Sequence, residues 1–120
     1  MPNIHSSTFI VAKAKRREQY GFPLAHLNDL EASEEVEKVL IGGDFNTDKD
    51  IDIDYLVKLH QEEGFLWASE TIGPTYQTLS GLFSYRLDHF FTRGFDLLEA
   101  GKSAETRASD HVPLWIKLRF

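Results

Sequence analysis

The run Val39-Leu40-Ile41-Gly42-Gly43-Asp44-Phe45-Asn46 decides how this chain is organised. Its first three residues form a compact apolar segment, which predicts a buried β-strand. The glycine pair predicts a tight turn where that strand ends, and an aspartate and an asparagine follow at once. Ionisable groups at strand ends are costly to bury unless they are paired, protonated or bound to a metal ion. The run therefore indicates a polar site at one edge of a sheet.

A strand and a helical segment are predicted before this run. Thr8 to Ala12 is apolar and rich in β-branched residues, as strands are. The pattern is helical from Lys13 to about Lys38, with an interruption near Gly21-Phe22-Pro23, because proline lacks an amide proton and restricts the residue before it. A basic cluster opens this segment: Lys13, Lys15, Arg16 and Arg17. We interpret the cluster either as a solvated helix face or as a contact for a phosphate-bearing substrate.

A second helix is predicted from about Ile53 to Glu63. Four aspartates stand at alternate positions around its start: Asp48, Asp50, Asp52 and Asp54. They do not form a calcium-binding loop, because Ile53 and Leu59 stand where such a loop requires glycine and glutamate. We expect these carboxylates to cap and charge the helix N-terminus, where the helix dipole favours them. Gly64 stands where a glycine that ends a helix belongs.

Three further strands are predicted towards the C-terminus. They cover Phe65 to Ser69, Arg86 to Thr92 and Val112 to Phe120. The last of them alternates clearly, and its apolar face is formed by Val112, Leu114, Ile116, Leu118 and Phe120. These patterns together predict an α/β domain of the α+β type, with about five strands and two or three helices.

Composition limits the classes of protein that fit. A chain of 120 residues, 42% hydrophobic and 27% charged, has room for one compact soluble domain. The net charge of −6 argues against a general nucleic-acid coat protein, which needs a basic surface. Cysteine is absent, so thiolate metal sites and thiol nucleophiles are excluded. We find no membrane span or signal-peptide pattern, which makes the cytoplasm the default expectation for an otherwise unknown location.

Polar residues lie directly after one predicted strand, inside the apolar run of a second and directly before the last. They form the pairs Asp44 with Asn46, Asp88 with His89, and Asp110 with His111. Each has a structural alternative when taken singly: Asp44 as a turn former, Asp88 as the partner of an arginine, and His111 as a satisfied core histidine. Three aspartates at such places, with histidine beside two of them, favour one polar cluster at one sheet edge.

These pairs lie within three blocks that resemble, in order and spacing, the last three signature blocks of the endonuclease/exonuclease/phosphatase family. This is the deoxyribonuclease I-like superfamily. The blocks are Ile41-Gly42-Gly43-Asp44-Phe45-Asn46-Thr47, Arg86-Leu87-Asp88-His89-Phe90-Phe91 and Ser109-Asp110-His111-Val112-Pro113-Leu114. Asn3-Ile4-His5 resembles that family's strand with a catalytic histidine, and Pro74-Thr75-Tyr76 resembles the turn before its Arg-x-Asp strand. The resemblance implies a metal-dependent hydrolase of phosphate esters that uses Mg²⁺ or Mn²⁺.

The resemblance also implies roles for the polar residues at the sheet edge. Asp44 would hold or activate the attacking water, alone or with a metal ion, and Asn46 would orient that water and the phosphate. Asp110 would bind the metal ion or lie next to a ligand of it. Carboxylate oxygens are ligands that Mg²⁺ and Mn²⁺ prefer.

Two histidines complete the implied site. His111 would donate a hydrogen bond to the scissile phosphate, and Asp88 would fix its tautomer and keep it cationic. His5 would be a second imidazole that contacts the phosphate or donates a proton. An imidazole backed by a carboxylate titrates near neutral pH, where such roles need it.

The chain resembles only the C-terminal half of that family's domain. Family members are about twice this length, and their first half supplies an asparagine and the principal metal-binding glutamate, which have no match in residues 1–120. The full fold is a four-layer sandwich of two sheets flanked by helices, so a half-domain would have one mixed or antiparallel sheet with helices on one face. Its other apolar face would be uncovered. We therefore expect a partial, truncated domain whose enzymatic activity is uncertain.

An alternative function follows from that uncovered face. The chain would then be a catalytically silent half-domain that acts as an interaction or self-assembly module. It would either associate with itself as an isologous dimer or bind a partner that supplies the first half. The class of phosphate ester is unknown at this stage.

Overall fold

The computed structural model describes residues 7–33, 36–78, 83–102 and 114–119. Its centre is a four-stranded mixed sheet in the order β1-β2-β6-β3. The strands are β1 (Ser7–Lys13), β2 (Lys38–Asp44), β6 (Asp88–Arg93) and β3 (Leu66–Trp67). β1 and β2 are parallel, whereas β6 is antiparallel to both β2 and β3. The predicted α+β class with a mixed sheet is therefore confirmed.

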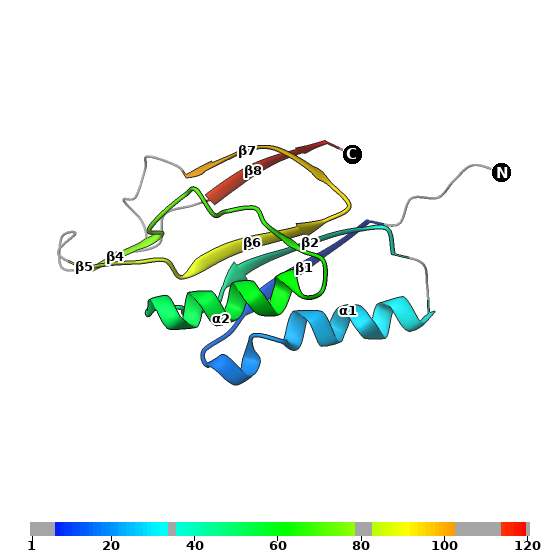
Figure 1. Ribbon diagram of the computed structural model, residues 1–120, viewed down its shortest axis with the longest axis horizontal. Coiled ribbons are helices and arrows are strands. Elements are labelled where there is room, and N and C mark those ends of the chain that lie inside the picture. The colour runs from blue at the N-terminus through cyan, green and yellow to red at the C-terminus, as the bar shows by residue number, and fades with distance from the viewer. Residues whose placement is uncertain (1–6, 34–35, 79–82, 103–113, 120) are drawn as a thin grey trace.

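Both long helices cover the same face of this sheet (Figure 1). A short 3-10 helix, η1 (Arg17–Gln19), precedes α1 (Phe22–Ser33), and α2 (Asp50–Gln61) follows β2. The break between η1 and α1 lies at the predicted position, with Pro23 in the first turn of α1, where a missing amide proton costs no helical hydrogen bond. No helix in the described ranges is long and apolar enough to cross a membrane.

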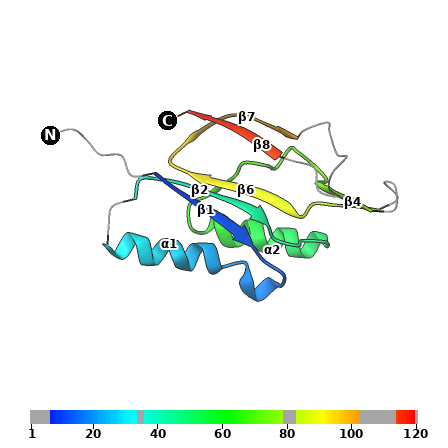
Figure 2. The ribbon, with the colours of Figure 1, turned by 180° about the vertical axis from the view of Figure 1, so that it is seen from behind.

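Two antiparallel strand pairs extend beyond the central sheet. β4 (Tyr76–Thr78) pairs with β5 (Phe83–Tyr85), and β7 (Asp96–Lys102) pairs with β8 (Leu114–Arg119). The β4–β5 pair lies past the edge of the sheet at which β2 ends and β6 begins (Figure 1). The β7–β8 pair lies on the side of the sheet away from the two helices, as both views show (Figure 2).

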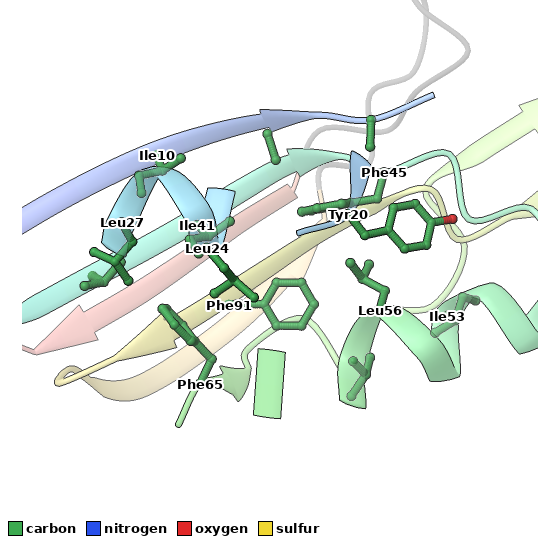
Figure 3. Packing of buried hydrophobic residues seen from close by; sticks show 14 residues of the cluster. Ile10, Tyr20, Leu24, Leu27, Ile41, Phe45, Ile53, Leu56, Phe65 and Phe91 are labelled. Carbon is green, nitrogen blue, oxygen red and sulfur yellow. The ribbon is translucent and has the colours of Figure 1, made fainter. Parts of the chain in front are cut away.

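The core lies between the sheet and the helices (Figure 3). Phe45 and Phe91 are fully buried there with their ring centroids 6.0 Å apart in an edge-to-face arrangement. Leu56 of α2 and Tyr20 between the two N-terminal helices pack into the same cluster. Burial raises the pKa of Tyr20 to about 12, so its phenol is neutral throughout the physiological range. The core thus holds Phe45, the residue between the two polar residues of the central turn, in one place.

The opposite face of the sheet is apolar and partly open. Side chains alternate between the faces of a strand, so Phe9 and Val11 of β1 point away from the helices while Ile10 and Ala12 are buried beneath them. Phe9 is 61% exposed and Val11 is 73% exposed. The expectation of an incompletely covered apolar face is confirmed for these residues.

Several predicted boundaries and elements were wrong in detail. Gly42 and Gly43 belong to β2 and do not form a turn, since they pair with Phe90 and His89 of β6. Helix α2 begins at Asp50, and its N-cap is Lys49, whose side chain makes no capping hydrogen bond. The aspartates of its first turn charge the helix end without capping it. More strands are present than expected, because β4, β5 and β7 add to those that were predicted.

Candidate functional site

Three charged residues form one row across the end of the central sheet. Lys13 of β1 is the register partner of Asp44 of β2, and Asp44 is the register partner of Asp88 of β6. Residues directly opposite in neighbouring strands point to the same face, with β-carbons about 4.5–5.5 Å apart in an antiparallel pair. The row therefore brings two carboxylates together on one face, with a lysine on the next strand.

The backbone after β2 turns sharply to place Asn46 beside this row. Asn46 has a positive φ of 52°, a conformation that asparagine tolerates better than most residues. Its backbone N–H donates to Oδ1 of Asp44 at 2.9 Å, and its Nδ2 donates to the carbonyl oxygen of Ala14 at 2.6 Å. The turn thus fixes the Asp44 carboxylate and ties Asn46 to the end of β1.

A buried polar network anchors this turn to the start of β6. The Thr47 hydroxyl donates to the carbonyl oxygen of Arg86 and lies 2.7 Å from Nε2 of His89. The indole N–H of Trp67 donates to Nδ1 of His89 at 3.2 Å, so the neutral imidazole carries its proton on Nε2 and donates it to Thr47. Burial, reinforced by the Arg86 charge, lowers the pKa of His89 to about 4. The imidazole is therefore a neutral connector at physiological pH.

Arg86 is held by partners on the segment that follows β3 and by the Trp67 ring. Its Nη2 donates to the carbonyl oxygen of Glu70 at 2.8 Å, and its guanidinium lies 4.6 Å from the centre of the Trp67 ring. Burial lowers the pKa of Arg86, an effect that the nearby acidic groups of Glu70 and Asp50 oppose. Arg86 thus closes the same network, because the Trp67 ring beneath it also donates to His89.

A depression of about 740 Å³ opens beside the turn. It is lined by residues from the end of β1, the turn after β2 and the β4–β5 pair: Lys15, Asn46, Asp48, Tyr76, Tyr85 and Leu87. The ring centroids of Tyr76 and Tyr85 are 6.2 Å apart, with the ring planes inclined by 37°. Asn46, Lys15 and Asp48 are exposed, whereas Leu87 is buried.

The structure brings together three of the predicted site residues. Asp44, Asn46 and Asp88 gather at the edge where β2 ends and β6 begins. His5, Asp110 and His111 lie outside the described residues, so their predicted roles stay predictions. Of the basic cluster, Lys15 lines the depression, while Arg17 forms an ion pair with Asp52 at 2.5 Å and does not lie on a helix face directed at the site.

The donor set at the row fits a hard divalent cation in part. Mg²⁺ binds through one or two carboxylates together with water and substrate phosphate, which the pair Asp44 and Asp88 can provide. In the part of the chain that the structure describes, no group of three or more histidine, aspartate or glutamate residues is arranged to hold a metal ion. Asp44 and Asp88 would therefore hold the ion only together with further ligands.

Sequence reasoning missed one contact of the site and one residue that lines the depression. Thr47 and His89 are 42 positions apart, and only the pairing of β2 with β6 brings them together. Tyr85 was missed because the β4–β5 pair was not predicted. The sequence shows that His89 lies inside an apolar run, but it does not show which atoms the imidazole contacts.

The fold of this chain matches about half of a larger domain in known proteins. No family model and no curated protein matches the sequence. Several solved structures do match the fold, among them the following three. An endonuclease/exonuclease/phosphatase family protein from Leptotrichia buccalis has a TM-score of 0.68 and is 19% identical in sequence. The match covers 97% of this chain and 49% of that protein's chain. A mannosyl-6-phosphatase from Bacteroides thetaiotaomicron has a TM-score of 0.65 and is 19% identical in sequence. That match covers 95% of this chain and 51% of the phosphatase chain.

The third structure is an endonuclease/exonuclease/phosphatase family protein from Bacteroides thetaiotaomicron. Its TM-score is 0.61 at 16% identity, with 93% of this chain and 48% of that chain covered. This chain thus spans about half the length of the solved proteins that it matches. The fold is that of about half of an endonuclease/exonuclease/phosphatase domain, as the sequence blocks predicted.

Proposed function

We propose that this chain belongs to the endonuclease/exonuclease/phosphatase family, as the C-terminal half of its domain, and that it carries part of a metal-dependent phosphate-ester hydrolase site. One observation carries the proposal: the register of β1, β2 and β6 places Asp44 and Asp88 side by side, next to Asn46. These are the positions that the sequence blocks assign to catalysis. The similar structures, which include a mannosyl-6-phosphatase, support the same chemistry.

The proposed reaction uses the fixed geometry of the turn. Hydrolysis of a phosphate ester needs a water in line with the leaving oxygen and neutralisation of charge on the other phosphate oxygens. Asp44, whose carboxylate accepts the Asn46 backbone N–H, would accept the proton of that water. The exposed Asn46 side chain has an amide that can orient the phosphate. Because the turn is tied to Ala14 and to Arg86, these groups are positioned before the substrate arrives.

A bound Mg²⁺ or Mn²⁺ would polarise the phosphate and lower the pKa of a bound water. Asp44 and Asp88 would hold it, with Asp110 as the further ligand that the resemblance implies. Lys13, the register partner of Asp44, adds positive charge to the same row. His111, oriented by Asp88, and His5 remain the proposed imidazole contacts for the phosphate.

Hydrolysis of bis-p-nitrophenyl phosphate tests this function. We expect Mg²⁺ or Mn²⁺ to stimulate cleavage by the full chain, and Asp44→Ala to reduce the stimulated rate by at least about 100-fold. Asp54→Ala is the matched control, since Asp54 is an exposed aspartate on α2, and it should keep the wild-type rate. Equal rates for wild type and Asp44→Ala would show that this chain alone is not an enzyme.

A second candidate function rests on the apolar face of the sheet. Phe9 and Val11 are exposed next to one another on the face that the helices do not cover. Solvent-exposed apolar patches mark interaction sites. The chain would then act as an assembly module, which either self-associates through this face or binds a polypeptide that completes the two-sheet fold.

The molar mass in solution tests this second candidate. Light scattering should give twice the mass of the 13.8 kDa chain, and Phe9→Ser with Val11→Thr should return it to the monomer. A wild-type monomer that binds no apolar dye would contradict the interaction role. If catalysis does not depend on association, the variant with both Phe9→Ser and Val11→Thr should hydrolyse the substrate at the wild-type rate. The mass and the hydrolysis rate of this variant therefore test the two candidate functions separately.

A further inference from the structure

Strand β1 forms one edge of the central sheet. The described strands follow the order β1-β2-β6-β3, so within the described residues no strand pairs with the outer side of β1. Its register with β2 runs from Ser7 to Lys13 without a bulge. Proteins that stay monomeric protect such an edge with charged residues, proline or bulges, or cover it with another element. The segment from Thr8 to Ala12 has no charge, no proline and no bulge, so β1 lacks these three protections.

The backbone of β1 offers hydrogen-bonding groups along this edge. Successive residues of a strand direct their N–H and C=O groups to alternate sides. The N–H of Ala14 donates to the carbonyl oxygen of Asp44 at 2.8 Å, so Ala12, two residues earlier, also directs its groups towards β2. The residues on either side alternate with it, so Phe9 and Val11 direct their N–H and C=O groups outward. An added strand would find donors and acceptors at both residues.

The edge also has space beside it. A hollow of about 350 Å³ lies between β1 and the start of α1. It is lined by residues 10–14 and by Gln19, Phe22, Pro23 and His26. Phe22, the first residue of α1, is largely exposed there. Side chains on the helix side of an added strand would enter this hollow.

The sequence of β1 is complementary to itself in antiparallel pairing. When Ile10 lies opposite the Ile10 of a second copy, Phe9 lies opposite Val11 of that copy, and Val11 lies opposite its Phe9. The outward N–H and C=O groups then meet in hydrogen-bonded pairs. Aromatic and β-branched residues that lie directly opposite one another stabilise a sheet. On the helix side, the small Thr8 of the second copy lies opposite Ala12, at the hollow.

Charge favours the antiparallel arrangement over the parallel one. A basic cluster begins at the end of β1 and comprises Lys13, Lys15, Arg16 and Arg17. Parallel pairing would place two such clusters side by side. Antiparallel pairing centred on Ile10 places the two Lys13 residues about 20 Å apart, at a rise of about 3.4 Å per residue. Salt screens charges beyond about 8 Å at physiological ionic strength, so the two clusters repel one another little in this arrangement.

We propose that two copies of this chain join through the outer edges of β1, in antiparallel pairing centred on Ile10, and form one continuous sheet across a twofold axis. Phe9 and Val11 of both copies then form one apolar strip on the face away from the helices. This inference rests on the assembly role proposed above. It names the partner as a second copy and the contact as the edge of β1 instead of the open sheet face.

Cysteine crosslinking tests this register, because the chain has no cysteine of its own. In the proposed pairing, the Cα atoms of Phe9 and of Val11 from the second copy are about 5.5 Å apart, a distance that a disulfide spans. Two Phe9 positions, or two Val11 positions, are diagonal neighbours about 7–8 Å apart, which is too far for a disulfide. An oxidised mixture of the Phe9→Cys and Val11→Cys chains should therefore form roughly tenfold more covalent dimer than either chain alone.

A matched mixture controls for random collision. Tyr55 is an exposed aromatic residue on α2, and a mixture of the Phe9→Cys and Tyr55→Cys chains should form no more covalent dimer than the Phe9→Cys chain alone. Equal crosslinking in all these samples, or none in the mixture of Phe9→Cys with Val11→Cys, would overturn the inference.

Val11→Pro gives a second readout that does not depend on oxidation. Proline removes one outward N–H and no bond to β2, and edge strands tolerate it on that side. We expect this variant to keep the wild-type circular dichroism spectrum and to become monomeric in light scattering. A folded variant that stays dimeric would contradict pairing through this edge.

The possible failures are distinguishable. A doubled mass without crosslinking between Phe9→Cys and Val11→Cys chains would keep the assembly role and overturn only the edge pairing. A wild-type monomer would overturn both. The hydrolysis assay reports on the proposed enzyme independently of either result.

Discussion

Nε2 of His89 lies 2.7 Å from the hydroxyl oxygen of Thr47, and this contact joins the turn after β2 to the first residues of β6. Both residues are almost completely buried. The hydroxyl also donates to the Arg86 carbonyl oxygen, so one side chain serves two partners. The proposed site therefore depends on a polar connection beneath it as well as on the carboxylates at its surface.

Thr47→Val tests this connection. The valine has nearly the same shape but leaves the Arg86 carbonyl and the His89 N–H without the hydroxyl, so we expect a loss of about 1–3 kcal/mol in the free energy of unfolding. Urea denaturation measures it. The exposed Thr71→Val should change stability by less than about 0.5 kcal/mol. Equal effects of the two variants would show that the network does not hold the turn.

Acid should destabilise the fold through two buried histidines. Burial lowers the pKa of both His60 and His89 from 6.5 to about 4. Between those values the unfolded chain binds protons that the folded chain excludes, so the free energy of unfolding falls as pH decreases from 6.5 towards 4. At pH 7 both imidazoles are largely neutral in either state, and this source of instability is small.

Denaturation at pH 6.5 and pH 5 measures this effect, with an expected loss of about 2–4 kcal/mol for the wild type. His60→Phe should remove about half of the loss, because His60 stacks on Phe91 at 4.0 Å and its Nε2 has no hydrogen-bond partner among the described residues. The exposed His26→Gln should keep the full wild-type dependence. A pH dependence that disappears with His26→Gln would refute the assignment.

Gly43 is required by the close approach of β1 and β2. Its φ is +151°, and a β-carbon there would collide with the carbonyl oxygen of Ala12. We expect Gly43→Ala to cost more than about 3 kcal/mol, enough to lower the thermal midpoint by more than 10 °C. Gly73→Ala is the control: its φ is +82°, but a β-carbon there meets no atom within 4 Å, so its cost should be about 1 kcal/mol. Thermal unfolding of the two variants distinguishes crowding from backbone strain.

The same glycine shows where sequence reasoning ends. The local composition predicts a turn at Gly42-Gly43, because glycine is common in turns. The pair instead lies within β2, where Gly42 makes room for the Phe90 ring and Gly43 for the backbone of β1. Neither neighbour is close in sequence, so no local pattern reveals them.

The local sequence pattern was sufficient to predict a strand where one face of that strand is buried. The apolar run of β2 and the alternating residues of β8 were found at the right places, since their periodicity records which face is covered. β7 was missed because Asp96-Leu97-Leu98-Glu99-Ala100-Gly101-Lys102 does not alternate, which agrees with its partly exposed, irregular pairing. For the site, the sequence blocks predicted roles for Asp44, Asn46 and Asp88, and these roles stay predictions. The Thr47–His89 contact could not be predicted without the register of β2 and β6.

We propose that Asp44, Asn46 and Asp88 form one site for a divalent cation and a phosphate. Paramagnetic broadening of backbone amide signals by Mn²⁺ tests it most directly, because it needs no turnover. We predict that substoichiometric Mn²⁺ broadens the amides of residues 44–47 and 86–89 first, and that Asp44→Asn abolishes this effect. Broadening that centres on residues 48–54, the acidic start of α2, and persists in Asp44→Asn would contradict the claim.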